Sequence, residues 1–110
     1  MNFFAFNLFK TQSIRFATRS SGWSKLRKQH LSSNPCCAAC GNCKKVEVHH
    51  IEPVHLSPEK ELDIDNLITL CDDPCHLLFG HLMDYKSWNK DVEQDCNNFY
   101  NKILDRPYKK

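Results

Sequence analysis

The hydrophobic and polar positions of the chain predict two short strands. Val46 and Val48 alternate with polar residues up to His50, and this two-residue period is typical of a strand. A second apolar run, Leu67 to Leu70, is interpreted as the partner strand. Prolines interrupt the segment between the two runs, so we expect a loop there.

Three helical segments are expected around these strands. The first spans about residues 23–31 and ends before Asn34-Pro35. The second begins near Pro74 and continues to His81. In the third, from Asp84 onward, apolar residues recur at spacings of three or four: Trp88, Val92, Cys96, Phe99 and Ile103. The pattern therefore predicts a small α+β domain with flanking helices.

The charges are distributed unevenly along the 110 residues. Residues 1–46 contain eight Lys or Arg and no Asp or Glu, and all 13 acidic residues follow them. We interpret residues 1–22 as a basic, flexible N-terminal arm and residues 23–110 as one folded domain that ends in a helix. A basic segment of this kind indicates contact with phosphate.

The start of the chain bears on localisation. Residues 1–9 are apolar, but they lack the positive charge and cleavage site of a secretory signal and are too short to span a bilayer. Arg15 and Arg19, among hydroxyl residues, fit either an organelle-targeting sequence or a basic arm, and we favour the arm. An intracellular, cytoplasmic protein without membrane contact is expected.

Seven cysteines add a chemical signal to this pattern. An odd number with CxxC spacing favours a metal site over a disulfide framework, and hence a reducing compartment. Two CxxC pairs overlap, Cys37 with Cys40 and Cys40 with Cys43. We favour the first pair, because Gly41 follows it and allows a tight turn.

The second cysteine pair is Cys71 with Cys75. Together with Cys37 and Cys40 it would supply four thiolates to a structural Zn²⁺, which closes a tetrahedral site. Such a site would connect the segment before the first strand to the end of the second. The remaining cysteines are interpreted as plain thiols, with Cys43 as the best substitute ligand: Cys36, Cys43 and Cys96.

Histidines and one asparagine complete the pattern. His49 and His50 are adjacent at the exit of the first strand, so they point to opposite faces. Asn66 and His76 follow, and the order His, Asn, His between cysteine pairs resembles the HNH endonuclease family, whose fold is a ββα-metal core. The resemblance covers about residues 23–90 and is densest over 37–81. Residues 80–89 also resemble a phage-type, zinc-stapled subgroup.

This resemblance implies a role for each residue. His50 stands at the position of the general base, Asn66 at that of the residue that braces the loop, and His49 and His76 at those of the metal ligands. The family often has another ligand four residues after the last of these, where this chain has Gly80. His81 is five residues on, about 140° around a regular helix, so it becomes a ligand only if the helix is distorted.

The function implied by the resemblance is metal-dependent cleavage of DNA. Its cofactors would be the structural Zn²⁺ and a divalent cation for cleavage, Mg²⁺, Mn²⁺, Ni²⁺ or Zn²⁺. Phosphate contacts are expected from basic residues of the acid-free half: Arg27, Lys28, Lys44 and Lys45. The alternatives are a non-catalytic zinc module that binds nucleic acid and a zinc-stapled protein-interaction domain. Monomer and dimer are both compatible with the sequence.

Overall fold

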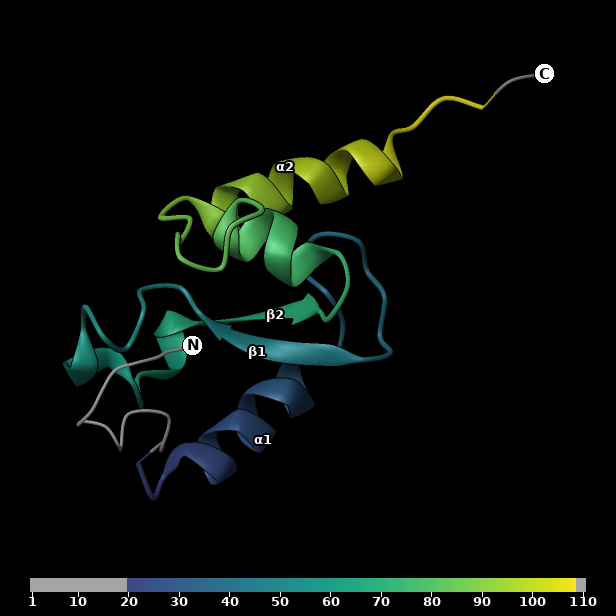
Figure 1. Cartoon of the computed structure of the whole chain (residues 1–110). Coiled ribbons are helices and arrows are strands. Elements are labelled where there is room, and N and C mark those ends of the chain that lie inside the picture. The colour runs from purple at the N-terminus through teal and green to yellow at the C-terminus, as the bar shows by residue number, and fades with distance from the viewer. Residues whose placement is uncertain (1–19, 109–110) are drawn as a thin grey trace.

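The computed structural model describes residues 20–108, and a two-stranded sheet lies at its centre (Figure 1). Helix α1 covers one face of the sheet, and the π-helical turn η3 with helix α2 covers the other. In chain order the elements are α1 (Trp23–Ser33), β1 (Val46–His50), η1 (Pro58–Lys60), η2 (Ile64–Asn66), β2 (Leu67–Cys71), η3 (His76–Gly80) and α2 (Val92–Leu104). The expected α+β class and ββα order are confirmed.

The register of the sheet decides where the two adjacent histidines point. Strands β1 and β2 are antiparallel, with His50 opposite Leu67 and Val46 opposite Cys71. Because neighbouring side chains alternate between faces, His49 lies toward η3 and His50 toward α1. The predicted arm, residues 1–22, lies outside the described residues except for its last three.

The core is small. Its fully buried side chains include Ala39, Leu70, Val92 and Cys96, each 0% exposed. Three of the four candidate zinc ligands are buried beside them. A core with so few large apolar side chains gains much of its stability from a staple such as a structural metal.

One predicted helix is shorter than expected. Residues 84–91 form turns rather than helix, and α2 begins at Val92. The Ser87 hydroxyl donates to the carbonyls of His81 and Asp84, and the Asn89 side chain donates to the Phe79 carbonyl at 2.9 Å. Such side-chain bonds to the backbone compete with helix formation, so the expectation of a helix from Asp84 was wrong for this segment.

Across residues 20–108, every helix is too short or too polar to cross a membrane.

Candidate functional site

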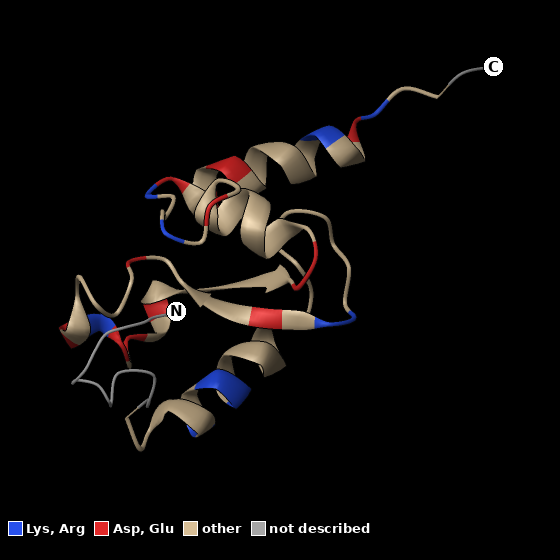
Figure 2. Cartoon of the chain, viewed as in Figure 1, with Lys and Arg blue, Asp and Glu red and all other residues tan. Residues whose placement is uncertain are grey.

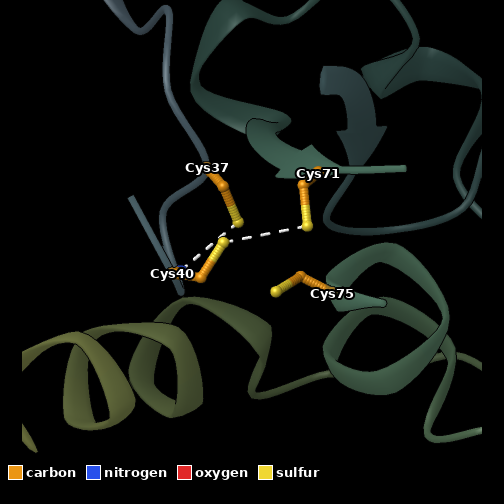
Figure 3. A group of neighbouring side chains, drawn as sticks. All are labelled: Cys37, Cys40, Cys71 and Cys75. Atoms are coloured by element: carbon orange, nitrogen blue, oxygen red, sulfur yellow. Dashed lines mark hydrogen bonds between the residues drawn. The ribbon is translucent and has the colours of Figure 1, made fainter. Parts of the chain in front are cut away.

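Four cysteines converge at one end of the sheet. Cys37 and Cys40 come from the turn before β1, Cys71 ends β2 and Cys75 immediately precedes η3. Figure 3 shows their sulfurs directed toward a common centre, and the four lie within 4.8 Å of one another. This group can hold a metal ion, and it connects the segment before β1 to the end of β2, as expected for the first CxxC pair.

The backbone of the cysteine turn prepares it for a metal. Gly41 has a φ of +80°, and its N–H donates to the Cys37 carbonyl at 2.9 Å. Burial by itself would raise the pKa of the Cys37 thiol, but bonds from surrounding N–H groups, Cys40 among them, hold it below its usual value. Burial raises the pKa of Cys40 and of Cys75, so a cation is needed to hold all of these groups as thiolates.

Two of the cysteines interpreted as plain thiols are paired instead. Cys36 and Cys43 form a disulfide across the turn, with Cα atoms 4.0 Å apart. The turn brings its two flanks together, as the 2.8 Å bond from the Cys37 N–H to the Asn42 carbonyl shows. The expectation was therefore wrong for Cys36 and Cys43. Cys96 is a free, buried thiol, as expected.

Three histidines form a second cluster on the η3 face of the sheet. His49 comes from β1, and His76 and His81 lie at the two ends of η3. Their candidate ligand atoms lie within 4.8 Å of one another. A π-helical turn closes over five residues, so it brings His76 and His81 together, and their Nε2 atoms lie 3.2 Å apart. The helix is therefore distorted in the way that His81 needs in order to lie beside His76.

Gly80 makes room for this cluster. A Cβ atom at this position would lie 3.1 Å from Cε1 and 3.2 Å from Nε2 of His49. The ring of His49 therefore fills the space that a side chain at position 80 would need. The sequence indicated only that Gly80 stands where the family often has a ligand. It did not reveal the contact with His49, which lies on a strand 31 positions earlier.

Hydrogen bonds orient the histidine rings. Nδ1 of His81 donates to the Ser87 carbonyl at 2.8 Å, which leaves the lone pair on Nε2. Nδ1 of His76 faces the Glu47 carboxylate at 3.8 Å. Nε2 of His49 is buried and has no hydrogen-bond partner among the described residues. A cation held by these nitrogens would supply the missing partner.

The electrostatics of the cluster also suit a cation. Burial, reinforced by the neighbouring His76 and His81, lowers the pKa of His49 to about 3. Burial likewise lowers the pKa of His76 to about 4, with His81 adding to the effect. Neutral imidazole is the form that binds metal, so both rings are ready to bind near neutral pH.

His50 lies on the other face of the sheet, in different surroundings. Its ring stacks on Trp23 with centroids 4.8 Å apart, and Nε2 lies 2.9 Å from the Glu61 carbonyl. A carbonyl only accepts, so Nε2 carries the proton and Nδ1 carries the lone pair. The Glu61 carbonyl is a contact that the sequence did not reveal, because a backbone group has no residue-type signal.

Asn66 holds the loop that contacts His50. Its Oδ1 accepts from the Glu52 N–H at 2.8 Å, and its Nδ2 donates to the carbonyls of Glu52 and Lys60 at 3.1 and 3.3 Å. Lys60 immediately precedes Glu61, whose carbonyl meets His50. Asn66 therefore braces the segment that orients the His50 ring.

The predicted phosphate-contacting residues occupy two segments. Arg27 and Lys28 lie on α1, and Lys44 and Lys45 are exposed just before β1 (Figure 2). Arg27 is half-buried. The neighbouring Asp72 and burial raise the pKa of the Glu47 carboxyl to about 7, and the charge of Arg27 opposes this rise. The blue segments of α1 and of the approach to β1 lie apart in Figure 2.

Comparison with known proteins gives one family. Residues 37–80 match the model of the HNH endonucleases, described as "HNH endonuclease". No curated protein and no solved structure matches the chain. The matched segment contains the four clustered cysteines, His49, His50, Asn66 and His76, and it stops one residue before His81. The residues of both clusters, except His81, therefore lie in the segment that is similar to the HNH endonucleases.

Proposed function

We propose that this protein is a metal-dependent endonuclease that hydrolyses phosphodiester bonds in DNA. The observation that carries the proposal is the convergence of His49, His76 and His81, with Nε2 of His49 buried and lacking a partner among residues 20–108. Such a set of neutral imidazoles fits a divalent cation. His50, at the adjacent position of β1 but on the opposite face of the sheet, is the candidate base.

We assign the roles of the residues on the basis of their contacts. His50 takes a proton on Nδ1 from the attacking water, because the Glu61 carbonyl fixes the other proton on Nε2. The water oxygen then bonds to phosphorus as the bond to the 3′ oxygen breaks. The leaving 3′ oxygen takes a proton from a second water molecule, so the products carry a 5′ phosphate and a 3′ hydroxyl. A divalent cation at His49, His76 and His81 would stabilise the charge on the phosphate and the leaving oxygen. Asn66 keeps the Lys60–Glu61 segment in place.

The two clusters would hold different ions. Four thiolates suit a structural Zn²⁺ and leave no open position for chemistry. The histidine cluster has only imidazole ligands, which suit Ni²⁺ or Zn²⁺ better than Mg²⁺. We therefore place the cleavage cation at the histidines and the staple at the cysteines.

The DNA backbone would be held by the basic residues of α1 and of the approach to β1. Arg27, Lys28, Lys44 and Lys45 lie in the described part of the chain that precedes the first acidic residue. Contacts of this kind neutralise phosphate without reading sequence.

A single substitution tests the chemistry. His50→Ala should lower plasmid cleavage by roughly 10²-fold or more, the usual loss for an acid–base group. Zinc content, folding and DNA affinity should stay unchanged, and added divalent metal should not restore activity. His49→Ala and His76→Ala should also lose activity, but excess cation should partly restore it. His55→Ala changes an exposed histidine of the loop that follows β1; it is the matched control and should cleave normally. Equal cleavage by wild type and His50→Ala would remove His50 from the mechanism.

The second candidate is a non-catalytic zinc module that binds nucleic acid. The burial of His50, 8% exposed beneath Trp23, favours this alternative because a general base must meet water. The test is to incubate plasmid with wild-type protein and each divalent metal. Intact plasmid together with tight DNA binding would show that the protein is the non-catalytic zinc module.

We further infer that the protein works in a reducing compartment such as the cytoplasm. Zinc binding needs Cys37, Cys40, Cys71 and Cys75 as thiolates, and all four are unpaired. The disulfide between Cys36 and Cys43 uses none of these ligands, so a reducing compartment would open it and leave the zinc site intact.

A further inference from the structure

The loop that follows the histidine cluster exposes large apolar side chains. Leu82, Met83 and Tyr85 are 54%, 65% and 62% exposed, within four consecutive positions. We call residues 82–85 the apolar loop. Contiguous apolar side chains on a surface often mark a binding site, because water solvates them poorly.

The backbone holds this loop in an unusual shape. Leu82 and Met83 have φ values of 54° and 72°. Residues other than Gly and Asn adopt this left-handed backbone conformation only at a cost in free energy. The Met83 N–H donates to the Leu77 carbonyl at 2.9 Å, and the Asp84 N–H donates to the His81 carbonyl at 3.1 Å. Backbone strain that surrounding bonds maintain is found mostly at functional sites. The apolar side chains are thus presented in a fixed direction.

The apolar loop lies directly against the candidate cation site. The ring of Tyr85 is 5.1 Å from that of His81 and 6.0 Å from that of His76, measured between centroids. Lys86 follows the loop, and its N–H is fixed by the Asp84 carboxylate at 2.9 Å. A phosphate bound at the histidines would therefore have the apolar loop beside it.

We propose that the apolar loop inserts against a base step of duplex DNA next to the cleaved phosphate. The proposal rests on the proposed nuclease function and adds the feature of DNA that the site would select. Leu82 and Met83 act as the wedge, while Tyr85 packs between this wedge and the histidines. Apolar side chains that enter a groove partly unstack a base step and kink the duplex.

A preference among DNA targets follows from this wedge. Unstacking is easiest at pyrimidine–purine steps and at mismatches, and hardest in stiff A-tracts. The protein should therefore bind and cut next to deformable steps, without hydrogen bonds to particular bases. The contact of Tyr85 with His76 and His81, where the phosphate of a nucleic acid would bind the cation, favours nucleic acid over a purely apolar partner.

Full-length protein with His50→Ala tests the wedge without cutting the DNA. Fluorescence anisotropy with Mn²⁺ compares two duplexes of equal length, one with a central mismatch and one with a central A-tract. A 2-aminopurine at the central step reports unstacking. We expect at least ~10-fold tighter binding to the mismatch, with increased 2-aminopurine fluorescence, because a mismatched step unstacks more easily than an A-tract.

The test variant adds Leu82→Asn and Met83→Asn, because Asn tolerates a positive φ and keeps the backbone shape. It should lose the preference and the fluorescence change, yet keep its zinc and its Mn²⁺ affinity. The control is Leu104→Asn, a 68% exposed leucine at the end of α2, which should behave like the parent. Replacement of both loop residues by Gly provides a second variant with the same expected loss.

Several outcomes would overturn the proposal. An unchanged mismatch preference in both loop variants would show that the loop does not touch the bases. Loss of Mn²⁺ binding together with the preference would show that the loop only supports His81. Self-association that disappears in the variants would assign the loop to a protein contact. A parent that binds DNA without step preference overturns the wedge alone, whereas a parent that binds no DNA also overturns the nuclease function.

Discussion

His76 and His81 are five positions apart in the sequence, yet their Nε2 atoms lie 3.2 Å from each other. In a regular α-helix these side chains would point about 140° apart. The π-helical turn His76–Gly80 removes this difference and directs both rings toward His49. The three-histidine cluster therefore depends on a local change of helix type.

Gly80→Ala should weaken cation binding at the histidines. The new Cβ would lie 3.1 to 3.3 Å from three ring atoms of His49, so the ring must move. Overpacking of a buried site typically costs ~1–3 kcal/mol, which corresponds to about 5- to 150-fold in Mn²⁺ or Ni²⁺ affinity measured by calorimetry. Gly22→Ala is the control, because its Cβ would meet only the flexible end of Leu62. Unchanged affinity in Gly80→Ala would show that His49 does not bind the cation.

Removal of one cysteine from the cluster should unfold the domain. Cys37→Ser and Cys75→Ser should each lose zinc and cooperative unfolding together, because structural zinc contributes about 10–16 kcal/mol in small domains. Metal analysis and thermal unfolding measure both effects. The double variant Cys36→Ser with Cys43→Ser is the control and should retain zinc, since this pair lies outside the cluster. Zinc loss in Cys43→Ser but not in Cys37→Ser would mean that Cys40 pairs with Cys43.

Stability should fall on mild acidification when the histidine cluster holds no cation. The pKa values of His49 and His76 are lowered to about 3 and about 4 in the fold. The unfolded chain takes up these protons near pH 6.5, so it binds more protons than the fold below that pH. The urea midpoint should therefore decrease between pH 7.5 and 5.5, with zinc content monitored throughout. His49→Gln should flatten this dependence, and an equally steep decrease in the variant would contradict the assignment.

DNA affinity should depend steeply on salt. Replacement of Arg27, Lys28, Lys44 and Lys45 by Gln should reduce the slope of log affinity against log salt by about 0.9 for each phosphate that the variant no longer neutralises. Anisotropy titrations between low and moderate salt measure the slope. A variant with Lys102→Gln and Arg106→Gln, at the far end of α2, is the control and should keep the wild-type slope. An identical slope in the fourfold variant would place the phosphate-binding residues elsewhere.

The sequence by itself determined the two strands and the types of candidate ligand. Strand β1 was predicted with its observed bounds, because alternation of valine with polar residues depends only on neighbours in the chain. The first CxxC pair and the position of Cys71 and Cys75 likewise followed from spacing, and the cysteines do meet. Local patterns are sufficient where the constraint itself is local.

Tertiary structure decided the rest. The meeting of His81, His49 and Gly80 requires a strand and a distorted turn to come together, and residue spacing along a regular helix excluded it. The Cys36–Cys43 disulfide arises because the cysteine turn brings its flanks together. The turns over 84–91 replaced a predicted helix because Ser87 and Asn89 bind backbone groups of preceding residues. In each case the residue or backbone group that makes the contact is not part of the periodic hydrophobic pattern, so only the folded chain specifies it.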